Sequence, residues 1–240
     1  MASVEMEKRS ARAGEPRKAT IASRISAELR QAILRGDMEP GAKINLDRTR
    51  EAYQVSVSPL REAMARLVSD GIVEFEDQLG YRVTPVSLAN LEEVTRLRID
   101  LETLALGYSI KAGDIDWESG VIAALHRLNR TERDPASTSS IEAWEMAHTA
   151  FHLQLIAGCG MPLLLNFCAV LHNLNDRYRR IFLLQNPGDR NVRDEHKAIA
   201  EATVARNQST ACTALARHIE RTGTNLRGKL AAVLPEGDSR

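Results

Sequence analysis

One stretch, Val55–Leu67, constrains the fold more than any other part of the chain, because it predicts a helix with one apolar face and one charged face. Ser58 is expected to cap the first free backbone N–H groups, and Pro59 suits the first helical position, where its missing N–H costs nothing. An apolar stripe at helical spacing predicts the buried face: Leu60, Ala63, Met64, Leu67 and Val68.

The opposite face of this helix carries charged and small side chains: Arg61, Glu62, Ala65 and Arg66. A short helix with arginines and small residues on its outer face suits the major groove of DNA. The same pattern also fits an ordinary amphipathic surface helix. Both interpretations stay open for this segment alone, and the flanking segments favour DNA binding.

Two more helices are predicted before this one, and a hairpin after it. Thr20–Arg35 has an apolar stripe at helical spacing, and Leu46–Tyr53 is typical of a shorter helix. Two β-prone runs around a polar loop with Gly80 predict a hairpin over residues 72–85. Three helices and a hairpin predict a winged helix-turn-helix over residues 20–86, whose hairpin tip reaches a neighbouring groove or phosphate.

Length and charge limit the class of protein. A chain of 240 residues is long enough for two domains, and a formal net charge of +0 excludes a uniformly basic coat for nucleic acid. Three cysteines, with no signal peptide and no membrane-spanning run, favour a cytoplasmic protein without a membrane partner. Residues 1–19 are expected to form a flexible arm and residues 233–240 a flexible tail.

Residues 87–232 are expected to form a second domain without strands. Short connections favour an antiparallel bundle. The predicted helical stretches are Leu88–Lys111, Trp117–Arg133, Ser140–Cys159, Pro162–Leu184, Arg190–Arg206 and Ser209–Leu230. The expected fold class is therefore mainly α, with an N-terminal winged helix-turn-helix and a C-terminal all-α antiparallel helical bundle.

Four histidines of this helical half share apolar-facing stripes. His148 and His152 are four residues apart, so they lie on one helix face, and His196 and His218 fall on the inward stripes of two later helices. Neutral imidazole is a common ligand for zinc, nickel or copper, and facing helices can bring such ligands together. The pattern predicts one divalent metal site with zinc or nickel as its ion.

The two other histidines and the enzyme alternative have simpler explanations. His126 and His172 are expected to be a surface residue or a hydrogen-bonded buried group. A metal-dependent hydrolase needs a metal-activated water and usually a general base. The pair of His148 and His152 lacks the glutamate of the His-Glu-x-x-His signature, although Glu145 offers a carboxylate nearby. We therefore expect no enzyme.

Short motifs follow one another in a specific order across residues 20–86: Leu29-Arg30, Ile33-Leu34-Arg35-Gly36, Pro40-Gly41, Val55-Ser56, Pro59-Leu60-Arg61-Glu62-Ala63-Met64, Leu67, Asp70-Gly71-Ile72-Val73 and Gly80-Tyr81-Arg82-Val83. In content and spacing this set resembles the DNA-binding domain of GntR-type transcriptional regulators. The resemblance implies that Arg61 contacts DNA and that Gly80 lets the wing approach the minor groove. The other residues of the third helix expected at the DNA are Ser56, Ser58, Pro59 and Arg66.

The chain departs from this family at positions that bear on DNA contacts. Val57 stands where the family usually has arginine, and Gln54 stands where it usually has glycine. The loss of the arginine removes one expected DNA contact. Arg48 or Arg50 of the preceding helix is expected to replace it.

The histidine motifs resemble a second family. His148-Thr149-Ala150-Phe151-His152, Asp194-Glu195-His196 and Ala216-Arg217-His218 are similar to the metal-ligand motifs of the helical FCD domain, with histidine in place of the usual aspartate at position 148. The resemblance covers nearly all of residues 88–230. Six helices rather than seven are more similar to its VanR-type branch.

Arginines suggest what this second domain binds. Arg98-Ile99-Asp100-Leu101-Glu102 resembles the segment that opens the FCD domain, and Arg177 and Tyr178 lie in an Arg-Tyr-Arg-Arg run that fits either a ligand site or a solvated face. A guanidinium near a metal binds a carboxylate with two parallel hydrogen bonds. We predict a small mono- or dicarboxylate effector that bridges the metal and Arg98, with Arg177 and Tyr178 second.

Together these features predict a homodimeric repressor that binds double-stranded, palindromic operator DNA and responds to a small organic acid. One alternative is a regulator for which the metal itself is the signal, without an organic effector. A metal-dependent enzyme is the remaining class.

Overall fold

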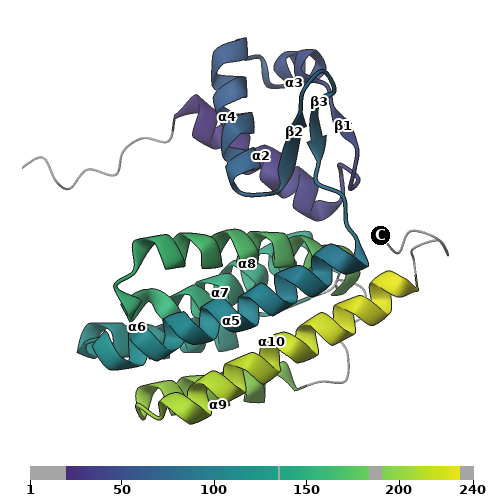
Figure 1. Cartoon of the computed structure of the whole chain (residues 1–240). Coiled ribbons are helices and arrows are strands. Elements are labelled where there is room, and N and C mark those ends of the chain that lie inside the picture. Colours follow the sequence, from purple (N-terminus) through teal and green to yellow (C-terminus); the bar gives the residue numbers. More distant parts are fainter. Residues whose placement is uncertain (1–19, 135, 184–190, 233–240) are drawn as a thin grey trace, which may run out of the picture.

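The computed structural model has a small winged-helix part above a larger helical part (Figure 1). The structure describes residues 20–134, 136–183 and 191–232. The expected N-terminal arm and C-terminal tail lie outside these residues. Within the described ranges, no helix has the length and apolar character needed to cross a membrane.

The three helices predicted for the first part are present. They are α2 (Ile21–Arg35), α3 (Leu46–Tyr53) and α4 (Val57–Ser69). Gly36, with φ of 85°, ends α2 and donates its N–H to carbonyls of the last turn. The apolar stripes of the helices meet in one core that includes Ile25, Leu29, Leu60, Met64 and Leu67.

Helix α4 begins two residues earlier than the sequence pattern predicted. Ser56 has the N-cap conformation but makes no side-chain cap hydrogen bond, so the prediction that Ser58 caps this helix was wrong. Pro59 is the third helical residue rather than the first. Its missing N–H is still without consequence there, because the first turn of a helix has no internal acceptors for its N–H groups.

The wing is a three-stranded antiparallel sheet in the order β1-β3-β2. The predicted hairpin is present as β2 (Val73–Glu76) and β3 (Gly80–Val83), with Glu76 opposite Gly80. Strand β1 (Lys43–Ile44) was not predicted, because two residues are too few to show alternation. Strand β1 lies in the connection between α2 and α3, and its pairing with β3 holds that connection against the hairpin.

The described residues of the second part form the six predicted helices, and the mainly-α fold class is confirmed. They are α5 (Leu88–Ala112), α6 (Ile115–Arg130), α7 (Thr138–Ile156), α8 (Pro162–Leu183), α9 (Val192–Val204) and α10 (Gln208–Ala231), with a short 3-10 turn η1 (Ala157–Cys159) after α7. Their common core includes Leu106, Val121, Phe151, Leu155, Ile199, Leu215 and Ile219.

Helices α5 and α8 lie between the winged helix and the far side of the helical part, where α9 and α10 lie (Figure 1). Helix α5 follows the wing after a short connection, and α8 packs against α2. The turn after α4 allows this approach, because Gly71 has φ of 72° and a Cβ there would lie 3.0 Å from the Leu174 side chain. A displacement of α8 would therefore act directly on the winged helix.

Candidate DNA surface and metal centre

The outer face of α4 and the wing form the candidate DNA surface. Arg61 and Ser58 are exposed on α4, and Arg48 is exposed on α3, whereas Arg50 is half-buried. Gly80 begins β3 with φ of 85° and has open space where a Cβ would lie, so nothing on this side blocks a close approach.

Arg66 is turned away from this surface. Its guanidinium donates to Glu62 Oε1 at 2.6 Å and to Ser23 Oγ at 2.8 Å, which draws it toward α2. The structure therefore places Arg61 in a better position for DNA than Arg66, although both follow from the same helical pattern.

The wing carries a surface that the sequence pattern did not reveal. Phe75 and Leu79 are more than half exposed, at 52% and 55%. Arg82, the basic side chain of β3, is paired with Glu74 and Glu76 on β2. Strands β2 and β3 thus offer apolar side chains and carboxylates. The exposed Lys43 of β1 lines the same hollow between α4 and the wing as Arg61 and Leu79.

Four histidines that are distant in sequence meet inside the helical part. His148 and His152 come from α7, His196 from α9 and His218 from α10, and all are 3% exposed or less. One ligand atom from each lies within 4.8 Å of the others. The structure brings together the four residues that the sequence suggested as metal ligands, and we call them the four-histidine site.

The ring nitrogens of this site suit a metal ion. His148 Nδ1 and both ring nitrogens of His152 are buried without a hydrogen-bond partner, which is unfavourable for nitrogens that nothing else satisfies. His218 Nδ1 lies 2.8 Å from Glu195 Oε2. A carboxylate on one ring nitrogen commonly orients the other toward a metal, so Nε2 is the expected ligand atom of His218.

His148 and His152 are in the protonation state that metals need. Burial lowers the pKa of both well below the usual value. Neighbouring imidazoles lower the pKa of both further, as do Arg179 for His148 and Arg98 for His152. Both rings are therefore neutral at neutral pH, with lone pairs available for an ion.

Arg179 on α8 is a site residue that the sequence reasoning missed. Its Nη1 lies 3.4 Å from His148 Nε2, and its Nη2 donates to the buried Glu145 at 3.1 Å. Trp144 stacks on His148 at a centroid distance of 5.0 Å, and the Arg179 Cζ lies 5.4 Å from the Trp144 ring. Arg133 Nη2 lies 3.5 Å from Glu145 Oε1, which Arg179 Nη2 also contacts, so two guanidinium groups share one carboxylate.

Arg177 and Tyr178 lie elsewhere, and the structure does not support their predicted place at the effector. Arg177 Nη1 donates to the Thr84 carbonyl at 2.8 Å, and the Tyr178 hydroxyl donates to Asn90 Oδ1 at 2.8 Å. Side chains two positions apart on a helix point in directions that differ by roughly 200°. Arg177 therefore points to the connection below the wing, while Arg179 points to the histidines. Both arginines are buried, which excludes a solvated face.

Arg98 is linked to the histidines through the carboxylate of Glu102. Its Nε donates to Glu102 Oε1 at 2.6 Å, and Glu102 Oε2 lies 3.2 Å from His172 Nε2 and 4.0 Å from His152 Nδ1. Burial alone would raise the pKa of Glu102, but Arg98 and His172 outweigh it and bring the pKa to about 2. The Glu102 side chain is thus deprotonated. Its position four residues after Arg98, one helical turn along α5, was the sequence feature that could have indicated this pair.

Comparison with known proteins identifies two families along the chain. Residues 21–83 match bacterial regulatory proteins of the gntR family, and residues 93–221 match the FCD domain. The chain is 34% identical to the uncharacterized HTH-type transcriptional regulator BphR of Paraburkholderia xenovorans (strain LB400), over 84% of each chain. It is 31% identical to the HTH-type transcriptional repressor GlaR of Escherichia coli (strain K12), over 80% of this chain and 89% of that protein.

Solved structures share the fold. E. coli McbR/YncC superposes with a TM-score of 0.71 at 19% identity, over 88% of this chain and 99% of that one. A putative transcriptional regulator GntR from Rhodococcus sp. RHA1 gives a TM-score of 0.69 at 21% identity, over 86% and 97%. At these identities the likeness concerns the arrangement of the helices and the wing alone.

Proposed function

The chain belongs to the GntR family of DNA-binding transcriptional regulators and carries an FCD domain, and from this premise we propose that it is a homodimeric repressor whose operator binding responds to a small carboxylate at a metal centre. The observation that carries the proposal is the buried four-histidine site with the Arg179 guanidinium beside it. The name of the relative GlaR, a transcriptional repressor, supports repression over activation.

The proposed ion is zinc or nickel. Four neutral imidazoles are suitable ligands for either ion, and neither ion needs the oxygen-rich shell that magnesium or calcium prefers. The histidines would hold the ion, and Glu195 would orient His218 from behind. When bound, the ion would supply a double positive charge in a buried cavity.

The proposed effector is a small mono- or dicarboxylate. Glu145 neutralises only one of the two guanidinium groups beside it, Arg133 and Arg179, so this corner of the cavity keeps an excess positive charge. An ion held by neutral ligands adds to it, and both attract an anion. We assign the direct arginine contact to Arg179 and keep Arg98, which Glu102 already binds, as an outer partner.

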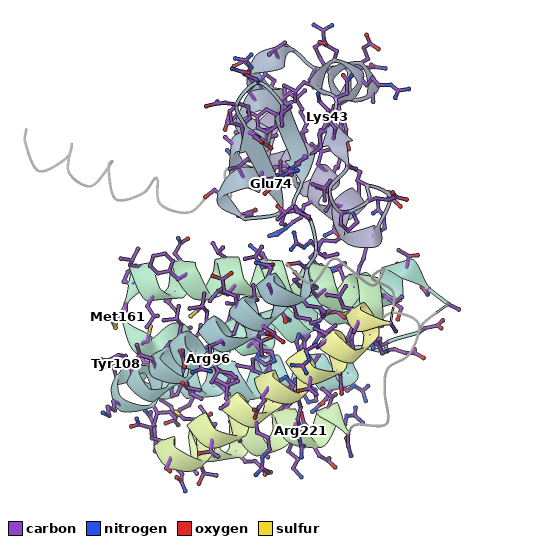
Figure 2. All side chains as sticks on the ribbon, turned by 45° about the vertical axis from the view of Figure 1, so that its right-hand side comes forward. Lys43, Glu74, Arg96, Tyr108, Met161 and Arg221 are labelled. Atoms are coloured by element: carbon purple, nitrogen blue, oxygen red, sulfur yellow. The ribbon has the colours of Figure 1, made fainter. Side chains whose placement is uncertain are left out.

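The proposed dimer uses the exposed apolar surface of α5 and the beginning of α8. Its side chains are Leu97, Leu104, Tyr108, Met161, Leu163 and Phe167. Figure 2 shows Tyr108 and Met161 at the same end of the helical part. A second copy would cover this surface and hold two winged helices at a spacing that suits two half-sites of a palindrome.

The effector proposal is tested by calorimetry with a panel of small organic acids on the metal-loaded protein. Arg179→Met should keep its metal and lose at least tenfold in affinity for the carboxylate that the wild type binds. Arg177→Met should bind the acid as the wild type does. Equal acid binding by wild type and Arg179→Met would refute the assignment.

The DNA contact is tested by operator binding at several salt concentrations. We expect Arg61→Ala to weaken binding by about 1–3 kcal/mol if Arg61 reads a base, and to lower the salt slope if it holds a phosphate. Arg96, which is exposed on α5 far from the wing, supplies the control Arg96→Ala (Figure 2). Unchanged affinity and unchanged salt slope in folded Arg61→Ala would contradict the assignment.

A second candidate function is a metal-responsive regulator without an organic effector. The four histidines supply four protein ligands, and closed sets of four protein ligands are typical of structural ions. Metal-dependent operator binding that no acid of the panel changes would favour this candidate over the carboxylate proposal.

A further inference from the structure

A second group of metal-ligating side chains adjoins the four-histidine site. Glu102 on α5, His152 on α7 and His172 on α8 each offer one ligand atom, and these atoms lie within 4.8 Å of one another. All three side chains are 2% exposed or less. His152 belongs to both groups, so the two groups are neighbours that share one ring.

The polar atoms of this group face one another without hydrogen bonds. Glu102 Oε2 lies 3.2 Å from His172 Nε2, yet neither atom has an aligned hydrogen-bond partner, and both ring nitrogens of His152 are likewise unpaired. Glu102 Oε1 is bound by Arg98 at 2.6 Å, which leaves Oε2 as the free acceptor. Buried polar atoms of this kind are normally satisfied, and a cation between them would satisfy all three side chains at once.

We propose that Glu102, His152 and His172 form a second position for the same divalent ion, which we call the Glu102 site. The proposal rests on the proposed metal centre, because His152 serves both sites. One ion occupies the pair at a time. Two divalent cations on either side of one neutral imidazole, with a single carboxylate between them and Arg98 close by, would repel each other strongly in a buried cavity.

The two sites differ in ligand chemistry. The four-histidine site offers four nitrogen ligands, whereas the Glu102 site offers two imidazoles and one carboxylate oxygen. Two histidines and one carboxylate typically leave open coordination positions on an ion. An ion in the Glu102 site, with three protein ligands, would therefore have more open positions for an effector carboxylate than an ion with four.

The two sites also connect different helices. The four-histidine site draws its ligands from α7, α9 and α10, whereas the Glu102 site draws them from α5, α7 and α8. Of these helices, α8 packs against α2 of the winged helix (Figure 1). His172 lies on α8 five residues before Arg177, which binds the Thr84 carbonyl at the base of the wing. The position of the ion thus determines whether it links the helices that contact the DNA-binding part.

The experiment measures Co²⁺ binding by equilibrium dialysis and elemental analysis, with circular dichroism as the check of folding. Wild-type protein should bind one equivalent. His196→Ala should still bind one equivalent, with affinity reduced at least tenfold, because the Glu102 site remains. The double variants His196→Ala/His172→Gln and His196→Ala/Glu102→Gln should bind none. His126→Ala, on the exposed face of α6, is the matched control and should bind as the wild type does.

Two results would overturn the Glu102 site. If folded His196→Ala binds no Co²⁺, the four-histidine site is the whole centre and the proposed function is unaffected. If its residual binding survives both His172→Gln and Glu102→Gln, these side chains are not ligands. Two equivalents in the wild type would overturn single occupancy, and no binding by the wild type would remove the metal from the proposed function as well.

Discussion

The contact between α8 and the base of the wing offers a direct test of how the two parts are joined. Arg177 is 1% exposed, and its Nη1 donates to the Thr84 carbonyl at 2.8 Å. A hydrogen bond from a charged donor contributes about 1.5–3 kcal/mol. Burial lowers the pKa of Arg177, so the buried charge itself is unfavourable and its removal offsets part of this loss. For Arg177→Met we expect a net destabilisation of about 1–2 kcal/mol.

The measurement is thermal unfolding of the metal-free protein by calorimetry. For a chain of this size, 1 kcal/mol corresponds to roughly 2–4 °C in the midpoint, so Arg177→Met should unfold about 2–8 °C lower. Arg96→Met is the matched control, because Arg96 is exposed and its pair with Asp100 spans 3.8 Å. We expect that control to shift the midpoint by less than about 2 °C.

A second measurement separates a link between the parts from simple packing. If Arg177 transmits the effector signal, Arg177→Met should bind the acid like the wild type but release operator DNA less when the acid is added. Equal unfolding midpoints for Arg177→Met and Arg96→Met, together with an unchanged operator response, would refute both the magnitude and the role.

Three further outcomes follow from local features. Burial keeps His148 and His152 neutral in the folded protein, so the unfolded state takes up more protons below about pH 6.5. Urea unfolding of the metal-free protein should therefore show the free energy of unfolding falling by roughly 1.4 kcal/mol per pH unit for each histidine below that pH. Equal stability at pH 7.5 and 5.5 would contradict this. Gln54→Gly should stabilise the protein by about 0.5–1 kcal/mol in the same assay, because Gln54 has φ of 51°, and a loss of stability would count against strain at this position. Gly223→Ala should cost about 1–3 kcal/mol, because its Cβ would lie 2.6 Å from a threonine methyl group of α5, whereas Gly228→Ala meets open space and should not destabilise.

The helices of the protein were predictable because their apolar stripes are long and their ends are marked. Amphipathic periodicity gave all of α5 to α10 to within a few residues, and the same periodicity placed His148 and His152 on one inward face. Strand β1 was not predicted, because its two residues form a strand through pairing with β3 and show no strand pattern of their own. The cap of α4 was misplaced because Ser56 and Ser58 are equally good capping residues by type.

The parts of the site that were missed depend on packing between helices. The Arg-Tyr-Arg-Arg run was noticed, but the choice between Arg177 and Arg179 depends on how α8 is rotated against α7, which a single helix does not reveal. No sequence pattern around His172 indicated a metal ligand. Its relation to Glu102 arises only where α5 and α8 cross, so the Glu102 site could be found only in three dimensions.

For the proposed effector, helix α8 offers a physical route from the four-histidine site to the winged helix. On one side it carries Arg179 beside the four-histidine site, and on the other it carries Arg177 at the base of the wing. A hydrogen-bonded helix moves as a stiff unit, so a carboxylate that draws Arg179 toward the ion would also shift Arg177. Half-sites of a palindrome lie about 34–36 Å apart, and a dimer that holds its two recognition helices at another spacing cannot occupy both. A coupling of about 1–3 kcal/mol would release DNA by roughly 5–150-fold, and linkage requires operator DNA to weaken acid binding by the same factor. Calorimetry of the acid with and without bound operator therefore measures this coupling independently of any gel shift. An acid affinity that operator DNA leaves unchanged would show that the two ligands are not coupled.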